Sequence, residues 1–454
     1  MVHRYRFNNL NIVLDVNSGA VHITDDAAYR ALALLDDTDG AHLCSETAAA
    51  ALAADFPKEE LQGALSEIKA LIDEGSLFAE ETKIEDDIIA ERGAVVKAMC
   101  LHVAHDCNMS CRYCFADGGA FAGDKALMSA DTGKRAVDFL LEHSGNRRNL
   151  EIDFFGGEPL INFPVVKEIV AYGREREKKL GKHIRFTITT NGLLLDSEKD
   201  DFCNAHMDNV VLSIDGRPAV NDAMRKTAGG GDTYDLILKN YKRFAQNRTG
   251  NYYVRGTFTN RNLDFSEDVR HLADLGFDNI SVEPVVAPDT CDFALREGDV
   301  PRILEEYDRL AALFLRRAQT GDGFSFFHFN IDTGGGPCVF KRIAGCGAGT
   351  EYVAVSPEGL IYPCHRFVGN PEFLMGDVRE TYFENAFYKM FNHAHIQRKS
   401  ACGACWAKFY CGGGCHANAW QANGDIMKPY AIGCELEKKR VECAIGIQAA
   451  LCDD

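Results

Sequence analysis

Three closely spaced cysteines constrain this chain more than any other feature of its sequence. Cys107, Cys111 and Cys114 have C-x3-C-x2-C spacing and directly follow the apolar run Ala98–Ala104. A short loop of this kind can fold three thiolates around one [4Fe-4S] cluster, for which four cysteines are the full ligand set. With only three protein ligands, one iron keeps an open position that can bind a small chelating molecule.

A zinc site is the competing interpretation of the same loop. Structural zinc takes four nitrogen or sulfur ligands, and His105 can supply the fourth. Three buried thiols without any metal are a further alternative. The loop alone leaves all three interpretations open, because short motifs also match by chance.

The number of cysteines favours a metal-binding protein. The chain has 17 cysteines among 454 residues, long enough for roughly two to four domains. No apolar run reaches the roughly 18 residues of a membrane span, and none resembles a signal peptide. We therefore expect a cytoplasmic protein with no membrane partner, in which clustered cysteines are metal ligands rather than disulfides. The net charge of -18 argues against a nucleic-acid partner.

Residues 1–90 have the pattern of a small separate module. Two apolar runs, Ile12–Val16 and Ala20–Ile23, flank Asn17-Ser18-Gly19 and predict a β-hairpin. Helical periodicity then follows in three segments: Ala27–Leu35, Glu46–Asp55 and Lys58–Ile72. Strands followed by three short helices resemble a winged helix, which many peptide-modifying enzymes use to hold a leader peptide. A purely structural or dimerising role is the alternative.

From about residue 96 to 330, apolar runs alternate with helical patterns. The predicted strands are Met99–His102, Leu150–Phe155, Ile184–Thr189, Val210–Ile214, Val254–Phe258 and Ile280–Val285. The predicted helices are Asp131–His143, Val165–Leu180, Ser197–His206, Asp235–Ala245, Phe265–Leu275 and Pro301–Ala318. Six strand–helix units indicate parallel strands with right-handed crossovers, and hence an α/β domain over 91–330. Sites in such sheets lie at the carboxyl ends of the strands, where the three-cysteine loop also falls.

Further motifs fall at the ends of successive predicted strands. Gly156-Gly157-Glu158-Pro159 follows the second strand, Asn191 the third, and Ser213-Ile214-Asp215-Gly216 the fourth, with Arg225 shortly after. Glycine lets backbone approach a ligand closely, and arginine suits a carboxylate. Each motif alone is ordinary turn chemistry. Their shared position at one edge of the sheet indicates a single site.

A second group of cysteines occupies the C-terminal region. Cys402, Cys405, Cys411 and Cys415 have C-x2-C-x5-C-x3-C spacing, and Cys434 follows. A zinc ribbon is the alternative here, because paired C-x2-C units occur in both kinds of site. We expect the remaining cysteines of this kind to be ordinary buried thiols: Cys44, Cys203, Cys291, Cys443 and Cys452.

Together these motifs resemble a known family. The loop Cys107–Cys114, with Tyr113 before its third cysteine, is similar to the signature of radical S-adenosylmethionine (SAM) enzymes, and the C-terminal cysteines resemble the SPASM extension. The resemblance implies an α/β fold with a partial (β/α)6 radical SAM barrel, an N-terminal winged-helix domain and a SPASM domain at 331–454. It also implies SAM and three [4Fe-4S] clusters as cofactors.

The resemblance gives roles to individual residues. Cys107, Cys111 and Cys114 would hold the catalytic cluster, and the amino and carboxylate groups of SAM would fill its open iron. The implied SAM-site residues are Tyr113, Gly156, Gly157, Glu158, Asn191, Ser213, Asp215 and Arg225. The implied ligands of the auxiliary clusters are Cys402, Cys405, Cys411 and Cys434 for the distal one, and Cys346, Cys364 and Cys415 for the proximal one. Cys338 is displaced from the position of a fourth proximal ligand, so we expect that position to be open to a substrate cysteine.

The combination looks most like the maturases of six-cysteine (SCIFF) peptides. These enzymes join a cysteine sulfur to a carbon of a ribosomally made peptide through a thioether. The implied partners are a cysteine-rich precursor peptide with a leader sequence and a reductant of the flavodoxin or ferredoxin type. The alternatives are formylglycine formation as in anaerobic sulfatase maturases, peptide epimerisation, and a non-catalytic Fe–S peptide-binding scaffold. The front module argues against the first, and the intact Gly156–Pro159 motif against the last.

Overall fold

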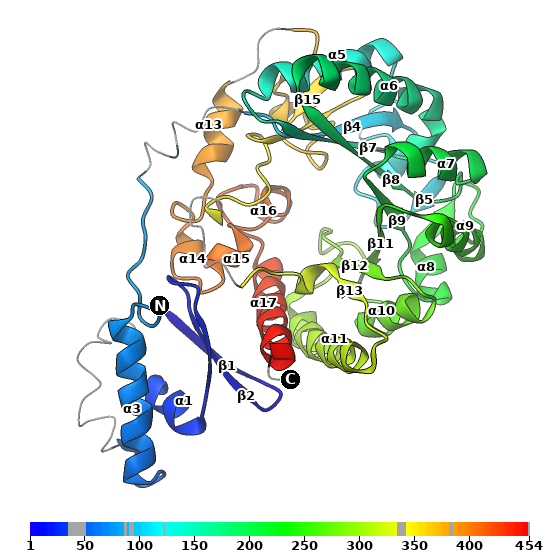
Figure 1. Cartoon of the computed structure of the whole chain (residues 1–454). Helices are drawn as coiled ribbons and strands as arrows, with labels where there is room; N and C mark the ends of the chain where they lie inside the picture. The colour runs from blue at the N-terminus through cyan, green and yellow to red at the C-terminus, as the bar shows by residue number, and fades with distance from the viewer. Residues whose placement is uncertain are drawn as a thin grey trace.

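A computed structural model describes most of the chain, and Figure 1 shows how its parts are arranged. The described residues are 1–34, 51–85, 89, 95–121, 123–333, 342–380 and 385–452. Among them, no helix is long and apolar enough to cross a membrane. The first half of the predicted helix Glu46–Asp55, residues 46–50, lies outside the described residues, and so do Cys44 and Cys338.

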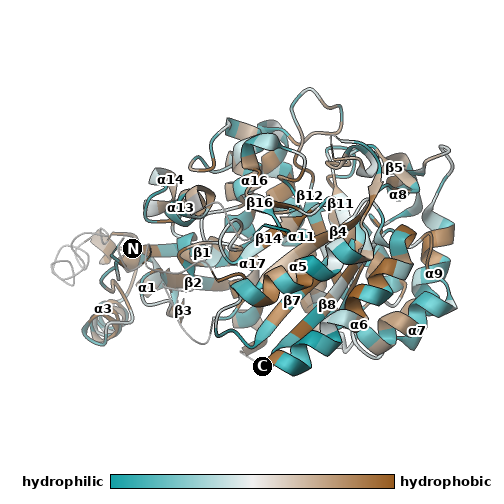
Figure 2. Ribbon diagram, turned by 90° about the horizontal axis from the view of Figure 1, so that it is seen from above, coloured by the Kyte–Doolittle hydropathy of each residue, from teal (hydrophilic) through white to brown (hydrophobic). Residues whose placement is uncertain are grey.

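The six predicted strands form and pair in parallel, in the order β4-β7-β8-β9-β11-β12. Alternate residues are buried in β7, β8, β9 and β11, as along β7, where Leu150, Ile152 and Phe154 are fully enclosed, whereas β4 is buried along almost its whole length. In Figure 2 hydrophobic residues are concentrated along strands such as β7 and β8. Their bounds are Ala98–His105 for β4, Asn149–Gly156 for β7, His183–Thr190 for β8, Asn209–Ser213 for β9, Asn251–Phe258 for β11 and Asn279–Pro284 for β12.

The helices between these strands also match their predicted positions, and they cover the outside of the curved sheet (Figure 1). Their bounds are Ala130–His143 for α5, Phe163–Leu180 for α6, Ser197–His206 for α7, Tyr234–Asn247 for α9, Phe265–Asp274 for α10 and Val300–Thr320 for α11. A short helix not predicted from the sequence, α8 (Pro218–Met224), precedes Arg225.

The sheet is wider than the six strands that the sequence predicts. β13 (Ser325–Phe326) adds in parallel to β12, and β14 (Tyr352–Val355) from the C-terminal region adds in parallel to β4. β15 (Leu360–Tyr362) and β16 (Gly376–Asp377) then continue antiparallel, so the sheet is mixed and has 11 strands. The C-terminal region therefore occupies the edge of β4 that a six-stranded sheet would leave unpaired.

The rest of the C-terminal region consists of short helices followed by one long helix. The short ones are α13 (Asn385–His393), α14 (Ser400–Gly403), α15 (Lys408–Cys411) and α16 (His416–Asn423). The long helix α17 (Ala431–Cys452) lies along α11 (Figure 1). Arg440 of α17 donates from Nε to the Tyr307 hydroxyl of α11 at 2.8 Å, which fixes the two helices side by side.

The front of the chain forms a three-stranded antiparallel sheet in the order β1-β2-β3. The predicted hairpin is confirmed as β2 (Leu10–Asp15) and β3 (Val21–Thr24), and β1 (Val2–Phe7) adds a strand that was not predicted. The predicted helices on either side of the undescribed stretch appear as α1 (Asp26–Ala33) and α3 (Lys58–Asp73). The winged-helix assignment itself stays a prediction.

The front sheet is packed on both faces, so the module is less separate than the sequence suggests. On one face Val13 shares a small core with α1 and α3. On the other, Phe7 packs against Gly446 of α17, where a Cβ atom would lie 2.3 Å from the Phe7 ring. His3 stacks on Trp406 with the ring centroids 3.7 Å apart, and its Nε2 lies 3.0 Å from a carboxylate oxygen of Glu442. The module is therefore docked on the C-terminal region.

Candidate active site and cysteine clusters

A cavity of about 270 Å³ opens at the carboxyl ends of the parallel strands. It brings together most of the residues for which the sequence predicts a role at the SAM site: Cys107, Cys111, Tyr113, Cys114, Gly156, Gly157, Asn191, Ser213 and Arg225. Glu158 and Asp215 are fully buried instead, and they do not line the cavity. These residues come from loops after four different strands, and the parallel topology brings those loops to one edge.

The three-cysteine loop is held by a small sheet of its own. β5 (Met109–Cys111) pairs antiparallel with β10 (Arg225–Thr227), which places Arg225 opposite Cys111. The Met109 N–H donates to the Cys107 sulfur at 3.4 Å, and the Asn191 amide nitrogen lies 3.6 Å from the same sulfur. Donors to sulfur and a nearby guanidinium favour the thiolate form, which is the form that binds iron.

Burial opposes thiolates in this loop while no metal is bound. It raises the pKa of Cys107 to about 12, and it raises the pKa of Cys111 despite the opposing charge of Arg225. Metal coordination deprotonates such thiols, so the loop fits a thiolate-bound cluster. His105, the alternative zinc ligand, lies elsewhere: its Nε2 is 3.1 Å from Nδ1 of His102, its ring stacks on Phe121, and it does not line the cavity.

The two glycines after β7 let the chain lie against the cysteine loop. Gly156 has φ of 129°, and a Cβ atom there would be 2.1 Å from the Ala104 carbonyl oxygen. A Cβ atom on Gly157 would be 2.3 Å from the Asp106 carbonyl oxygen. Any side chain at either position would push the turn away from the cysteine loop and change the shape of the cavity.

Glu158 joins the ends of two strands from behind the cavity wall. Its carboxylate accepts hydrogen bonds from the Thr190 hydroxyl at 2.8 Å, the Asn191 N–H at 2.7 Å and the Leu160 N–H at 3.0 Å. Burial raises its pKa to about 7, against the lowering effect of these donors. The arrangement makes Glu158 a residue that positions Asn191. Its predicted contact with the amino group of SAM stays a prediction.

A second buried carboxylate, Asp215, braces the opposite side of the site. The Tyr113 hydroxyl donates to it at 2.7 Å, and Arg225 donates to the Tyr113 oxygen at 3.0 Å. The Thr257 N–H donates to the same carboxylate at 3.0 Å, and burial raises the pKa of Asp215 to about 6. This chain of contacts connects the cysteine loop to the ends of β9 and β11, a role that sequence analysis did not assign.

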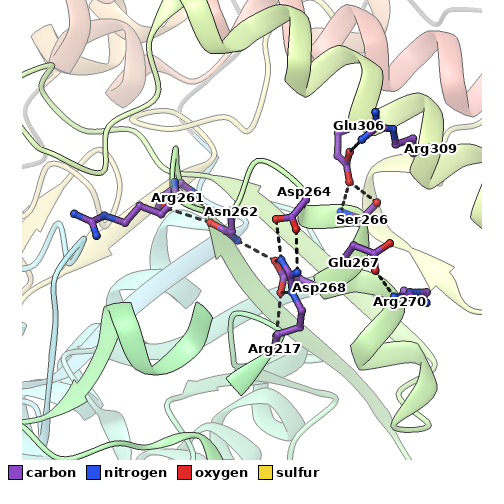
Figure 3. Close-up of polar contacts among 11 residues, drawn as sticks. Arg217, Arg261, Asn262, Asp264, Ser266, Glu267, Asp268, Arg270, Glu306 and Arg309 are labelled. Atoms are coloured by element: carbon purple, nitrogen blue, oxygen red, sulfur yellow. Dashed lines mark hydrogen bonds and ion pairs between the residues drawn. The ribbon is translucent and has the colours of Figure 1, made fainter. Parts of the chain in front are cut away.

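The turn after Asp215 is tied to helix α10 by the contacts drawn in Figure 3. Arg217 donates from Nε to Asp268 at 2.7 Å and from Nη2 to Asp264 at 2.8 Å. Asp268 is fully buried, and the Asn262 amide also donates to it, at 3.0 Å. Gly216 lies so close to Asp268 that a Cβ atom would be 2.4 Å from the Asp268 Cβ. In the sequence, the Gly216-Arg217 pair directly after a predicted strand was the signal that could have predicted this contact between the turn and α10.

The C-terminal cysteines fall into two neighbourhoods. In the first, burial raises the pKa of Cys346 and Cys364, and the charge of the nearby Cys415 adds to both shifts. In the second, burial raises the pKa of Cys434 and Cys411. The charges of Cys402 and Cys405 add to the shift of Cys434, and that of Cys434 adds to the shift of Cys411. These are the same two groups as the predicted proximal and distal ligand sets, although the ligand roles themselves stay predictions.

Two expectations about the other cysteines need correction. Cys203 and Cys443 are buried as expected, but Cys452 is exposed and Cys291 is partly exposed. Cys452 lies in the last turn of α17, beyond the segment of that helix that is packed most tightly. An apolar residue at a helix end has fewer neighbours to cover it, which sequence composition does not reveal.

Comparison with known proteins finds that two stretches of this chain match domain families. A model of the Radical SAM superfamily matches residues 101–259, and the SPASM iron-sulfur cluster-binding domain matches residues 346–406. The uncharacterized protein MJ0907 of Methanocaldococcus jannaschii is 30% identical over 190 residues, 41% of this chain and 62% of that protein. Radical SAM cyclopropyl synthase TigE of Paramaledivibacter caminithermalis is 22% identical over 373 residues, 77% of this chain and 74% of TigE.

Two solved structures share the fold. Native anSMEcpe with bound AdoMet superimposes with a TM-score of 0.65 at 18% identity, covering 79% of this chain and 99% of that one. Streptococcus suis SuiB bound to precursor peptide SuiA gives a TM-score of 0.53 at 16% identity, covering 95% and 98%. The second match extends over nearly the whole chain.

Proposed function

We propose that this protein modifies a peptide by radical chemistry, because the chain contains a radical SAM domain and a SPASM iron-sulfur cluster-binding domain. The two domains imply [4Fe-4S] clusters and SAM as cofactors. The single observation that carries the proposal is the shared cavity, in which the three cysteines face Gly156, Gly157 and Arg225. The finer assignment is thioether formation between a cysteine sulfur and a carbon of a precursor peptide.

The residues at the cavity suit the first step of this chemistry. Cys107, Cys111 and Cys114 would hold a [4Fe-4S] cluster, which when reduced supplies the electron that splits SAM into methionine and a 5′-deoxyadenosyl radical. Gly156 and Gly157 line the cavity beside the loop, and Arg225 places a cation where a carboxylate can bind. The sheet residues around them exclude water from the reacting atoms.

The same cavity continues toward the C-terminal region, where a substrate residue would bind. Its wall there includes Arg255, Glu283, His365 and Arg366, and the last two directly follow Cys364. A peptide side chain in this part would lie between the SAM site and the proximal cysteines. In thioether formation one hydrogen atom passes to the deoxyadenosyl radical, the thiol loses a proton, and one electron leaves as the carbon–sulfur bond forms. A nearby auxiliary cluster is a suitable acceptor for that electron.

Relatives support a peptide or protein substrate. SuiB has been solved with its precursor peptide SuiA, and anSMEcpe with a peptide called Cp18Cys. A serine-type anaerobic sulfatase-maturating enzyme of Klebsiella aerogenes is 23% identical over 332 residues, so formylglycine formation is the second candidate. The mass of a co-expressed cysteine-rich peptide separates the two. Thioether formation removes two hydrogens per link and leaves fewer free thiols, whereas formylglycine formation also replaces the sulfur of a cysteine by oxygen.

The proximal cysteines leave one ligand position to be assigned. Cys346, Cys364 and Cys415 are neighbours, and Cys338 lies outside the described residues. We infer that a substrate thiolate binds the fourth position, which would lower its pKa and hold the sulfur near the carbon radical. Cys338→Ala should keep the cluster and much of the activity, and peptide should change the cluster spectrum. If this variant lost the cluster, and if peptide did not change the cluster spectrum of the wild type, Cys338 would be identified as the fourth ligand.

The front module offers a groove for a leader peptide. A cavity of about 330 Å³ lies between β3, α1 and α3, with Ile23, Leu32, Ile68 and Leu71 in its wall. β3 is an edge strand of the front sheet, so an extended leader can add to it by main-chain hydrogen bonds. Asp25 and Glu67 also line the groove and would favour a leader that carries basic residues beside apolar ones.

A surface substitution tests this groove better than deletion of residues 1–90, because β1 is packed against α17 and its removal would expose a buried face. Leu71 lines the groove from α3 and is only partly buried, and Leu71→Asp should weaken leader binding by at least tenfold. Leu236, on helix α9 and 50% exposed, gives the control substitution Leu236→Asp. Equal leader affinity in both variants would contradict a role of the groove in leader recognition. It would not affect the assignment of SAM cleavage, which does not depend on the groove.

A further inference from the structure

Two lysines in the SPASM region are almost completely buried. Lys399 has 1% of its surface exposed and Lys408 has 4%. A buried ammonium is costly unless other groups compensate for the lost hydration. The two lysines flank the same cysteines, since Lys399 precedes Cys402, and Lys408 lies between Cys405 and Cys411. They differ in how their charge is balanced.

Lys408 has a conventional partner. Its ammonium lies 2.7 Å from a carboxylate oxygen of Glu81, in the segment that leaves the front module, and it donates to the Gly403 carbonyl oxygen at 3.2 Å. This ion pair fastens residues 81–85 to the C-terminal region. The charge of Lys408 is therefore balanced by protein groups whatever the cysteines bind.

Lys399 has no carboxylate partner within the part of the chain that the structure describes. Its ammonium donates to the Gly413 carbonyl oxygen at 2.8 Å and lies 3.5 Å from Nδ1 of His416. A Cβ atom on Gly413 would be 3.6 Å from the Lys399 nitrogen, so the glycine turn wraps closely around the lysine. One neutral carbonyl does not balance a buried charge.

The groups that can balance Lys399 are cysteine sulfurs. Burial lowers the pKa of Lys399, and the charges of Cys402, Cys411, Cys415 and Cys434 oppose that shift. Three of these cysteines belong to the predicted distal set and Cys415 to the predicted proximal set. The Gly413 carbonyl that binds the Lys399 ammonium is two residues from Cys411 of the distal set and two from Cys415 of the proximal set, so Lys399 is bound to the turn that joins the two sets. As neutral thiols these groups leave the lysine uncompensated, whereas thiolates bound to an iron-sulfur cluster carry net negative charge.

We propose that Lys399 is a positioning residue for electron transfer, which supplies a fixed positive charge between the two auxiliary iron-sulfur sites and raises their reduction potential. Reduction adds one electron to a cluster and forms or breaks no bond. Because the electron adds negative charge, a nearby cation stabilises the reduced cluster. The potential of such clusters depends on net charge, hydrogen bonds and solvent exposure. The inference rests on the proposed auxiliary clusters. The positive charge of Lys399 would make these clusters better acceptors for the electron that leaves the substrate.

The test is a redox titration of the full-length protein, monitored by electron paramagnetic resonance. Cys107, Cys111 and Cys114 are replaced by Ala so that only the auxiliary clusters contribute, and iron is counted first. Lys399→Met should lower the ratio of reduced to oxidised auxiliary cluster by tenfold at a fixed potential, which corresponds to 59 mV for one electron. Lys399→Arg, which keeps the charge, should restore most of the ratio.

Lys408→Met is the matched control, because it removes a lysine that is equally buried but has a carboxylate partner. It should change the ratio less than twofold. If Lys399→Met fails to retain iron, Lys399→Gln provides a second neutral variant with a polar end for the Gly413 carbonyl. Full iron with an unchanged potential in a neutral Lys399 variant, or equal shifts in both lysine variants, would overturn the inference. Absence of iron at the C-terminal cysteines of the parent protein would instead contradict the proposed function.

Discussion

The two groups of cysteines lie in different kinds of structure. The barrel group is in a loop beside a sheet with 11 described strands: Cys107, Cys111 and Cys114. In the C-terminal group, Cys402 and Cys411 lie on helices of only four residues each. The barrel loop is held by strand pairing, by the Tyr113–Asp215 contact and by the glycine turn after β7. Helical segments of four residues are not stable alone, so the C-terminal ligands depend on what they bind. We therefore predict that the barrel site forms before metal binds, and that metal organises much of the C-terminal region if the cysteines there bind it.

The largest effect should come from removing the barrel ligands. Replacing Cys107, Cys111 and Cys114 together by Ala should abolish SAM cleavage, because no other described cysteine lines the cavity. Iron should fall by about a third, from about twelve to about eight per chain if three clusters are present. Iron analysis and chromatography of 5′-deoxyadenosine measure both quantities. Stoichiometric zinc without iron in anaerobically purified protein would contradict the radical chemistry altogether.

A C-terminal ligand should behave differently. If an iron-sulfur cluster joins the short helices, Cys411→Ala should raise amide hydrogen exchange over residues 400–424 by at least tenfold and leave β7 and β8 unchanged. Cys203→Ala is the matched control, since Cys203 is buried on α7 and has no predicted ligand role. If exchange in α14 and α15 stayed at the wild-type level, protein packing alone would hold this region.

Next in size is the anchor behind the barrel site. Arg217→Met should destabilise the protein by about 3 kcal/mol, because it leaves the fully buried Asp268 carboxylate without its cation. Lys69→Met removes an exposed pair with Asp73 and should cost about 1 kcal/mol or less. Denaturant unfolding of the two variants measures the difference. Similar losses would mean that the turn after β9 does not depend on this network.

The smallest expected effect concerns Asp153, which faces the inside of the barrel from β7. Burial raises its pKa to about 7, although the Thr189 hydroxyl and Arg255 oppose the shift. Because the folded pKa lies above the unfolded one, its contribution to stability is fully present below the ordinary value of 3.8 and is lost progressively as the pH rises from there to about 7. Asp153→Asn should therefore stabilise the protein more at pH 8 than at pH 5, by about 1 kcal/mol. Melting temperatures at the two pH values test this, and a difference of the opposite sign would contradict it.

Sequence analysis predicted the strands and helices of the barrel well because their signals are local. Alternation in Leu150–Phe155 and helical spacing in Ser197–His206 each depend on a few neighbouring residues. β1 was missed because its inward face includes His3 and Tyr5, which do not give a simple apolar pattern. The pairing of β14 with β4 joins residues some 250 positions apart, which no local pattern can specify.

The same limit applies to the site. Cysteine spacing and strand-end position were enough to predict nine of the residues that line the cavity, but not Arg255, Glu283, His365 or Arg366, because only the first group follows from chain order and parallel topology. They did not show that Glu158 and Asp215 lie behind the wall, where each binds donors from more distant parts of the chain. Nor did they identify Lys399, whose significance depends on its burial and on its hydrogen bond to Gly413 in the turn between Cys411 and Cys415.

The central claim is that the three barrel cysteines hold a cluster whose open iron binds SAM. Electron–nuclear double resonance of the reduced protein with SAM carrying a ¹³C- or ¹⁷O-labelled carboxylate tests it most directly. We expect a hyperfine coupling between the label and a cluster in the wild type and in Cys411→Ala, and no coupling when Cys107, Cys111 and Cys114 are replaced by Ala. Coupling that persists without these cysteines, or none in the wild type with full iron, would contradict the account.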